Sequence, residues 1–427
     1  MNDTKSNFGR KGWMIIIYVL FLYMFSATPP DTLNVTAGWF AEVIGVDSTS
    51  LLPFFAVGGF VGILVALVLG QFIAKKGVKW PTVGILIVYA LIWFLNGFVK
   101  SVPMYAVITI LLVAVSDAMN LVSTQQIMNN WFPKKKGIAL GWSTMGMCFS
   151  SAIMVAVFSA LKGAINIQAP YYLMTVICII LAIVTAVWFK NYPEEAGAYP
   201  DNEPLTEEQK AANLKLINEY KSDFTLGKLL KTKELWALIF LFGFLFLGLV
   251  GITSQMIPRM ACVGFEQNVA IMCLTISSII GIFGSFGWGW VDQRIGTKKA
   301  VEIFCVCWTL MCAVAACGAF GVSKPVTIAS IVMYSLLLGG LGNLMPSLTI
   351  TIFGRYDFPQ ANKIMVPLVV CIRSFALFIV PAMIELAGGT GHEAEGYFRV
   401  FVILTILSVI STIIAFCTKD KMIGKEN

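Results

Sequence analysis

Charged residues are scarce in this sequence. Asp, Glu, Lys and Arg make up 12% of its 427 residues, whereas hydrophobic residues make up 58%. A soluble globular domain has about 25% charged residues, so the composition excludes that class. The shortage of charge predicts a protein that crosses a lipid bilayer many times.

Histidine is nearly absent, and the cysteines lack the spacing of metal ligands. The one histidine, His392, falls in a predicted loop among glycines, and the ten cysteines are scattered through apolar segments. Cys305 and Cys307 are separated by a single residue, which does not match a metal-binding pair. We therefore expect no metal site, no cofactor and no catalytic dyad, which argues against an enzyme.

Long apolar runs fill most of the chain. A helix needs about 20 residues to cross roughly 30 Å of hydrocarbon. The first six runs lie near residues 13–38, 49–74, 80–99, 104–131, 137–161 and 168–189, and the second six near 235–258, 268–292, 299–320, 326–353, 363–387 and 397–417. The sequence therefore predicts an all-α integral membrane protein with twelve transmembrane helices.

These spans divide six and six around one hydrophilic segment. We expect a bundle over residues 1–190, a cytoplasmic linker over 191–233 and a second bundle over 234–427. Within the linker, Thr206 is followed by acidic residues and is predicted to cap a short helix.

Basic residues favour one side of the membrane. Most of the 30 Lys and Arg residues fall at the two ends of the chain, in the even-numbered loops and in the linker. Such residues remain on the cytoplasmic side, so both termini are predicted to be cytoplasmic in an inner (plasma) membrane. The net charge of +7 mostly reflects this asymmetry, and no nucleic-acid partner is expected.

Two loops share a pattern of glycine and basic residues. The second span ends in Gly70-Gln-Phe-Ile-Ala-Lys75-Lys76-Gly77, and the eighth ends in Gly289-Trp-Val-Asp-Gln-Arg294-Ile-Gly296. This pattern resembles the gating loops of the major facilitator superfamily, which implies two pseudo-symmetric six-helix bundles. The chain departs from that family at Ala74 and Gln293, where an acidic residue is expected. The usual salt-bridge latch of this loop is therefore in question.

A narrower resemblance comes from two further segments. They read Asn130-Trp-Phe-Pro-Lys-Lys-Lys-Gly137-Ile-Ala-Leu-Gly141 and Tyr192-Pro-Glu-Glu-Ala-Gly-Ala-Tyr-Pro200. Both resemble the oxalate/formate antiporter family and its monocarboxylate-carrier relatives, which implies transport of small organic anions by alternating access. In the oxalate carrier two cationic residues bind the dicarboxylate. The matching positions here are Ser285 and Arg373, so the resemblance implies a ligand with a single carboxylate.

Arg373 is also singled out by its depth. It lies about ten residues into its apolar run, roughly 15 Å from the surface. A charge there costs several kcal/mol unless it faces a partner or a water-filled cavity. A planar guanidinium suits capture of one carboxylate, although a structural ion pair between helices is the alternative.

Asp117 reaches a similar depth in another span, and Asn120 and Thr124 extend a polar stripe along the same helix face. Asp117 lies sixteen residues before Pro133, and Asn343 lies sixteen before Pro359. If the two halves are related by an internal repeat, the acid Asp117 in the first half corresponds to the amide Asn343 in the second. If a substrate carboxylate takes Arg373, Asp117 loses its partner and binds a proton, which predicts H⁺ symport. Anion exchange with a structural Asp117 is the rival.

Other residues complete the predicted site. Asp31 follows Pro29 and Pro30 and is a second candidate for proton coupling, or a lining residue of the outer vestibule. Substrate contacts are predicted for Asn343, Ser285, Trp142, Tyr334 and Phe375, the aromatic rings forming an apolar wall.

The sequence therefore predicts a secondary active transporter, acting as a monomer in the lipid bilayer, for a small organic anion such as a monocarboxylate. Two other ligand classes remain open: a zwitterion such as a betaine, carnitine-like compound or amino acid, and a bulkier anion such as a bile acid. A membrane sensor on a transporter scaffold is the non-transport alternative.

Overall fold

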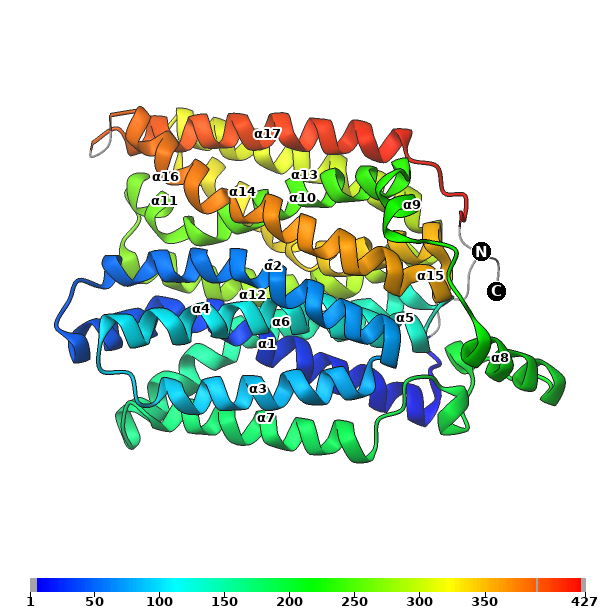
Figure 1. Ribbon diagram of the computed structural model, residues 1–427. Coiled ribbons are helices and arrows are strands. Elements are labelled where there is room, and N and C mark those ends of the chain that lie inside the picture. Colours follow the sequence, from blue (N-terminus) through cyan, green and yellow to red (C-terminus); the bar gives the residue numbers. More distant parts are fainter. Residues whose placement is uncertain (1–5, 389–390, 424–427) are drawn as a thin grey trace.

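The computed structural model describes residues 6–388 and 391–423, and all regular structure within them is helical (Figure 1). The first half contains α1 (Gly9–Ile44), α2 (Leu52–Lys76), α3 (Lys79–Asn96), α4 (Val102–Ala118), the π-helix η2 (Met119–Ser123), α5 (Thr124–Trp131), α6 (Lys136–Ala164) and α7 (Ala169–Val187). The second half contains α10 (Lys233–Ser254), α11 (Met256–Cys262), α12 (Gln267–Ile295), α13 (Thr297–Phe320), α14 (Lys324–Leu338), α15 (Gly340–Ser374), α16 (Ala376–Leu386) and α17 (Glu393–Cys417).

Twelve membrane crossings are confirmed. In the described residues, 11 helical segments are long and apolar enough to span a bilayer, and one of them, Lys324–Leu386, contains 63 residues. That segment is folded back at Gly354, where φ is 76°. Only glycine adopts this backbone conformation without strain, so the chain reverses there and the long segment crosses twice.

The helices form two bundles that lie side by side (Figure 1). In the first, α1 packs on α6, α2 on α4, and α3 on α7. In the second, α13 packs on α17 and α14, and α10 packs on α15. Between the bundles, α6 packs on α12, and α2 packs on α15. These two crossings are where the bundles touch most extensively.

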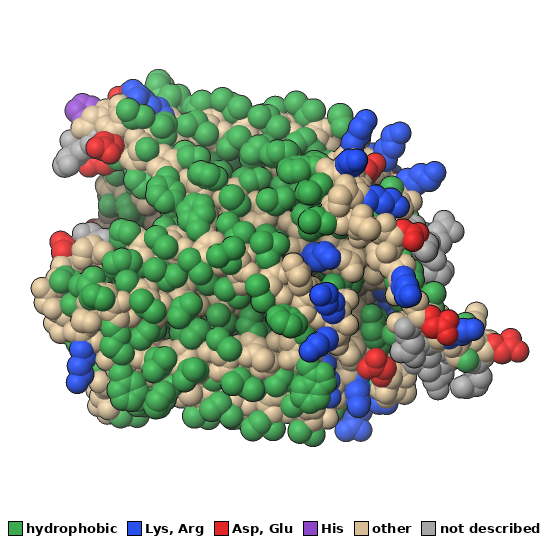
Figure 2. Space-filling view, in the orientation of Figure 1, with side chains coloured by type: hydrophobic (Ala, Val, Ile, Leu, Met, Phe, Trp, Pro, Cys, Tyr) green, Lys and Arg blue, Asp and Glu red, His purple; other side chains and the backbone are tan. Residues whose placement is uncertain are grey.

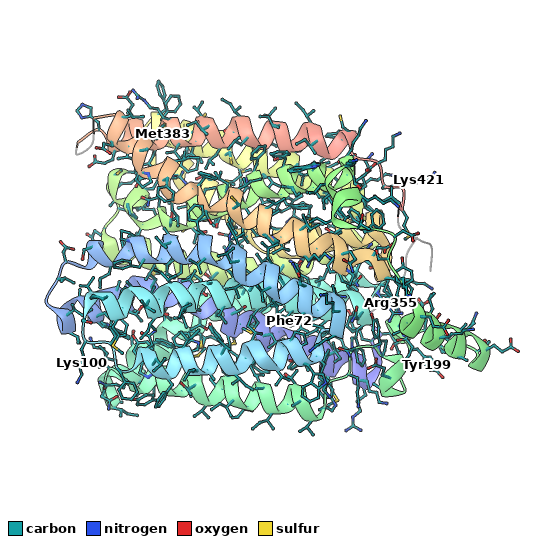
Figure 3. All side chains as sticks on the ribbon, in the orientation of Figure 1. Phe72, Lys100, Tyr199, Arg355, Met383 and Lys421 are labelled. Carbon is teal, nitrogen blue, oxygen red and sulfur yellow. The ribbon has the colours of Figure 1, made fainter. Side chains whose placement is uncertain are left out.

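The outer surface is suited to lipid. Large apolar side chains such as Leu64, Phe283 and Ile183 are more than half exposed, and hydrophobic side chains cover the middle of the molecule (Figure 2). Lys and Arg gather at one end, which we call the basic end. Arg355, Tyr199 and Lys421 lie toward this end, and Lys100 lies at the opposite end (Figure 3). An apolar belt between polar ends is the pattern of a membrane protein.

The linker is helical in part and lies at the basic end. It holds η3 (Glu194–Ala196), η4 (Pro200–Asn202), α8 (Glu207–Glu219) and α9 (Leu226–Leu230). The Thr206 hydroxyl accepts a hydrogen bond from the Gln209 N–H at 3.2 Å, and the Gln209 side chain accepts from the Thr206 N–H at 3.0 Å. The predicted cap is therefore confirmed as a capping box.

The proline pair within α1 is supported by a neighbouring helix. Pro29 has no N–H, so the carbonyl of Phe25 loses its donor within the helix. The Tyr89 hydroxyl of α3 donates to that carbonyl at 3.0 Å. The prolines can therefore lie within the continuous helix α1 without leaving this polar group unpaired.

Candidate functional site

Asp117 and Arg373 form an ion pair between the two bundles. Asp117 lies in the last turn of α4, Arg373 lies near the end of α15, and the guanidinium Nη2 donates to the carboxylate Oδ2. Their side chains are 21% and 15% exposed, so the pair is not sealed in the protein interior. The structure thus places together the two intramembrane charges that the sequence singled out.

Helix α2 lies against this pair. A Cβ added at Gly62 would lie 3.7 Å from the Asp117 Cβ, and one added at Gly59 would lie 3.1 Å from the Ser374 Oγ. Glycine at both positions brings the α2 backbone close to α4 and α15 at the level of the charges. On this side, the Asp117–Arg373 pair is therefore bordered by the backbone of α2.

The rest of the polar stripe faces α1. The Asn120 amide donates to the Ser26 hydroxyl at 2.8 Å, and Thr124 donates to the Asn120 carbonyl. Asn120 lies in the π-helix η2, which begins two residues after Asp117; such single-turn π-helices are frequent at functional sites. Asn120 thus bonds to α1 just before its proline pair, while Asp117 bonds to Arg373.

Ser285 and Asn343 lie in a closed seam between the bundles. Both are fully buried, and each hydrogen-bonds to Thr144 of α6. The Asn343 amide also donates to the Ser285 carbonyl at 2.6 Å, and the Ser285 hydroxyl donates to the Gly141 carbonyl at 3.1 Å. A ligand reaches these two predicted contacts only when the seam opens.

The three predicted aromatic contacts have separate surroundings. Trp142 packs on Trp13 and Phe286, and its indole N–H donates to the Ser6 hydroxyl at 3.1 Å. Tyr334 is buried beside Trp308 and hydrogen-bonds to Thr253. Phe375 is 49% exposed and contacts Phe60. Within the described part of the chain, the three residues share no aromatic neighbour, so they do not form one continuous wall.

Asp31 lies on α1 just after the proline pair. Its Oδ2 is buried and has no hydrogen-bond partner among the described residues. Nearby, the Thr28 hydroxyl of α1 contacts the Ser150 hydroxyl of α6 at 3.5 Å. Asp31 is therefore placed at the α1–α6 contact, and its role as a proton site stays a prediction.

Glycines of the gating loops make close contacts between the bundles. A Cβ on Gly70 of α2 would lie 2.8 Å from the Lys363 Cβ, and one on Gly289 of α12 would lie 2.4 Å from the Gly137 carbonyl oxygen. Lys363 and Gly137 each lie four residues after the proline of a Phe-Pro pair. The same contact therefore occurs once in each half of the repeat.

The other residues of these loops have local roles. Gly77 and Gly296 have φ values of 75° and 92°, which end α2 and α12. Lys75 is exposed, and the Arg294 guanidinium lies 4.7 Å from the Trp290 ring centroid. Among the described residues neither makes an ion pair. This agrees with the lack of an acid at Ala74 and Gln293.

We expect Gly289→Ala to hold the basic end open, because the added Cβ collides with backbone of the other bundle. The measurement is the distance between spin labels at positions 76 and 299, one in each bundle. Gly287→Ala is the matched control, since nothing lies within 4 Å of a Cβ added there. Equal distance distributions in the two variants would contradict the assignment of Gly289 as a closure contact.

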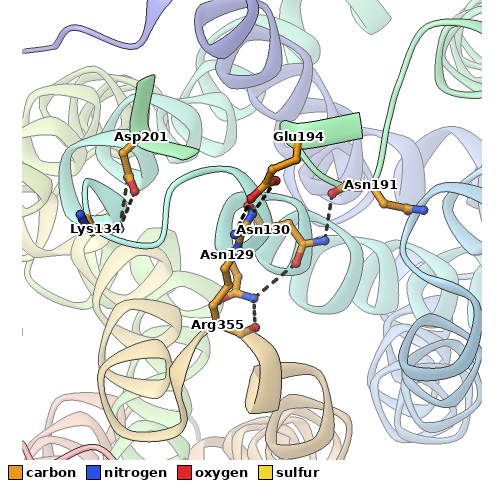
Figure 4. A network of polar contacts seen from close by, with 7 residues as sticks. All are labelled: Asn129, Asn130, Lys134, Asn191, Glu194, Asp201 and Arg355. Carbon is orange, nitrogen blue, oxygen red and sulfur yellow. Dashed lines mark hydrogen bonds and ion pairs between the residues drawn. The ribbon is translucent and has the colours of Figure 1, made fainter. Parts of the chain in front are cut away.

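The sequence did not reveal a buried ion pair at the basic end (Figure 4). Arg355 donates from Nη1 and Nη2 to the two Glu194 carboxylate oxygens at 2.9 and 3.2 Å, and the side chains are 3% and 0% exposed. The guanidinium also donates to the Asn130 carbonyl, and the Asn129 amide donates to the Arg355 carbonyl at 2.8 Å. We call these four residues the clasp.

The linker is fixed to both bundles around the clasp. Asp201 accepts hydrogen bonds from the N–H groups of Lys134 and Lys135, at 3.1 and 2.6 Å, just before α6 begins. Burial raises the pKa of Asp201 to about 6, and these two hydrogen bonds oppose that rise. On the other side, the Ser222 hydroxyl donates to Asp357 at 2.5 Å. The basic end is therefore closed by the seam, the clasp and the linker, whereas the molecule is hollowed between the bundles at the opposite end (Figure 2).

Known proteins of similar sequence and fold are transporters. The chain is 24% identical over 307 residues to an oxalate:formate antiporter of Oxalobacter formigenes, which covers 69% of this chain and 68% of the relative. Its fold is similar to the proton:xylose symporter XylE, with a TM-score of 0.76 at 13% identity over 96% of this chain and 97% of the other. It is also similar to FucP in the outward conformation, with a TM-score of 0.68 at 13% identity over 95% and 98% of the two chains.

A third solved structure, the human organic anion transporter MFSD10, has a TM-score of 0.66 at 14% identity and covers 94% of this chain and 98% of its own. The sequence model of the Major Facilitator Superfamily matches residues 14–366. That match covers most of the chain and agrees with its twelve crossings, two bundles and paired gating loops. The chain belongs to the Major Facilitator Superfamily of membrane transporters.

Proposed function

We propose that the protein carries a small organic anion with one carboxylate across the membrane, and that Arg373 holds the carboxylate. The observation that carries this proposal is the Asp117–Arg373 pair, partly exposed and shared between the two bundles. A guanidinium accommodates a carboxylate in a planar, bidentate geometry. In the empty carrier Asp117 occupies that position, and a substrate carboxylate replaces it.

Two observations support a monocarboxylate. Formate, one of the two anions for which the relative from Oxalobacter formigenes is named, carries a single carboxylate, whereas oxalate carries two. In this chain Ser285 contributes a hydroxyl where the resemblance places a second cation, and that hydroxyl is bonded to Thr144. One cation neutralises one carboxylate, so a dianion leaves an unpaired charge in the site.

Asp117 couples this exchange to protons. A carboxylate that loses its ion-pair partner inside the membrane binds a proton, because an unpaired charge there is costly. Substrate and H⁺ therefore enter the site together, and both leave when the site opens to the other side. Asp31, whose Oδ2 is unpartnered among the described residues, is a second proton site in this scheme.

We expect Asp117→Asn to abolish the response of uptake to an imposed pH gradient. The asparagine keeps the shape of the side chain but cannot bind the proton. The measurement is uptake of radiolabelled monocarboxylates into proteoliposomes with and without an inward H⁺ gradient. A gradient response that survives in the variant would exclude Asp117 as the coupling residue.

Anion exchange is the second candidate, favoured by the antiporter relative. In exchange, an internal anion must be present for uptake, whereas a symporter takes up substrate into anion-free vesicles. A thermal-shift screen of mono- and dicarboxylates, betaines and bulky organic acids identifies the ligand class. Stabilisation by betaines and not by simple acids would point to a zwitterion.

We further propose that the basic end faces the cytoplasm of a plasma membrane, following the distribution of Lys and Arg. The closed basic end and the hollow at the other end then correspond to an outward-facing carrier. Residues 1–190 and 234–427 move as two bodies around the Asp117–Arg373 site, with residues 191–233 as their linker.

A further inference from the structure

A small cavity lies inside the first bundle, beside the proline pair of α1. Its volume is about 20 Å³, and its lining comes from α1, α2, α3, α4 and α7. Pro29 and Thr32 contribute from α1, Asn96 from α3, Thr109 from α4 and Tyr171 from α7. Phe55 contributes from α2, so five different spans line the cavity, and neither Asp117 nor Arg373 is among its lining residues.

Among the described residues, three polar atoms on its wall lack a hydrogen-bond partner, and the first is the indole Nε1 of the buried Trp93. The Oδ1 of Asn96 and the hydroxyl of Tyr171 are buried, in side chains that are 4% and 1% exposed. Among the described residues neither atom has a hydrogen-bond partner. Buried polar groups in native proteins are almost always bonded to protein or to ordered water, because leaving one unpaired costs about 1–3 kcal/mol. Their occurrence on the wall of one cavity points to a common partner.

A water molecule matches the cavity in both size and chemistry. A bound water requires at least about 10–15 Å³ and two to four polar partners. The Tyr171 hydroxyl can donate to it, and Asn96 Oδ1 can accept from it. The hydroxyls of Thr32 and Thr36 donate to carbonyls of their own helix, at 2.8 and 3.1 Å, so their oxygens are able to accept a second bond from the water.

Other occupants fit less well. The lining residues include no acid, so a cation would have no counter-charge. An organic substrate is larger than a cavity of this volume. The remaining lining side chains are apolar or aromatic, with the Trp93 ring stacked on Tyr171 at a centroid distance of 6.1 Å.

We propose that one water molecule is a resident component of the first bundle and joins Asn96 of α3 to Tyr171 of α7 beside the proline pair of α1. The water satisfies the unpartnered polar atoms on the cavity wall. The part of α1 that lines the cavity then rests on a hydrated contact, which can adjust to small movements without breaking a direct hydrogen bond.

The direction in which Tyr171→Phe changes the unfolding temperature tests this inference. If the water is present, Tyr171→Phe removes a hydrogen bond to it and lowers the unfolding temperature of the purified full-length protein. If the cavity is dry, the same change removes an unsatisfied hydroxyl and raises that temperature. Thr82→Val is the matched control, because the buried Thr82 hydroxyl is also unpartnered among the described residues but does not line the cavity. No fall is expected there.

A second measurement needs no variant. X-ray hydroxyl-radical footprinting produces radicals from bound water, so Tyr171 is expected to be oxidised although its side chain is only 1% exposed. Absence of oxidation at Tyr171, or an unfolding temperature that is raised or unchanged by Tyr171→Phe, would overturn the proposal. Both results are independent of which substrate the protein carries.

Discussion

Replacement of Arg373 by alanine is expected to reduce substrate affinity by at least about 100-fold. The change removes two charge-assisted hydrogen bonds to the carboxylate, a loss of roughly 3 kcal/mol or more, and each 1.4 kcal/mol is a factor of ten. It also leaves Asp117 without its ion-pair partner. Arg373→Lys retains the charge but not the planar pair of donors, so an intermediate loss is expected. Ligand-dependent thermal shifts and uptake into proteoliposomes measure both effects.

Two controls separate lost binding from misfolding. The double variant Asp117→Asn with Arg373→Ala removes both charges and leaves no unpaired ion, so it is expected to fold and still fail to bind. Arg399→Ala alters an exposed arginine that pairs with Glu395 on the surface, and transport should be unchanged. Substrate binding that survives in a folded Arg373→Ala protein would remove Arg373 as the anchor.

Glu194→Gln is expected to open the basic end. The variant leaves the Arg355 guanidinium buried without a counter-charge, and breaking a buried pair in this way costs about 3–5 kcal/mol. That penalty applies to the closed state only, because Arg355 reaches water once the bundles separate. The ratio of open to closed molecules should rise by at least about 100-fold. Spin labels at positions 76 and 299 report it as a longer distance.

The chain offers a matched control for this prediction. Lys134 and Glu203 form a 2.8 Å ion pair at the same end of the molecule, but their side chains are 73% and 43% exposed. Exposed pairs contribute about 0–1 kcal/mol, so Glu203→Gln should leave the distance distribution unchanged. Replacing both Glu194 and Arg355 by methionine should restore closure, because the buried charge is then absent. An unchanged distribution in Glu194→Gln would contradict the role of the clasp.

The transmembrane fold could be predicted from the sequence because each crossing is a continuous apolar run of the chain. Arg373 and Asp117 could be singled out as well, because a charge at mid-bilayer depth is costly unless it has a partner or faces water. Ser285 and Asn343 were predicted as substrate contacts, and this stays a prediction, because their burial in the seam depends on which end of the carrier is closed. Which end is closed depends on how the two bundles pack against each other, and no short stretch of sequence indicates it.

Arg355 was missed for a different reason. In the sequence, Arg355 is one of many basic residues in the predicted cytoplasmic loops. The general excess of Lys and Arg on that side of the membrane was enough to explain its presence there. The available signal was its position in the repeat, because Arg355 and Asn129 each lie four residues before the proline of a Phe-Pro pair. The same count back from the Phe-Pro proline matched Asn343 to Asp117. Residues at corresponding positions in the two halves can contact each other at the interface between the bundles.

The contact between Asn129 and Arg355 joins two residues that hold the same position in the two halves of the repeat. If the two halves were identical, the same residue type would stand on both sides of this contact. Two arginines would repel each other, and two asparagines would leave Glu194 without a cation. The observed arrangement of one asparagine, one arginine and Glu194 therefore depends on a difference between the two halves at this position.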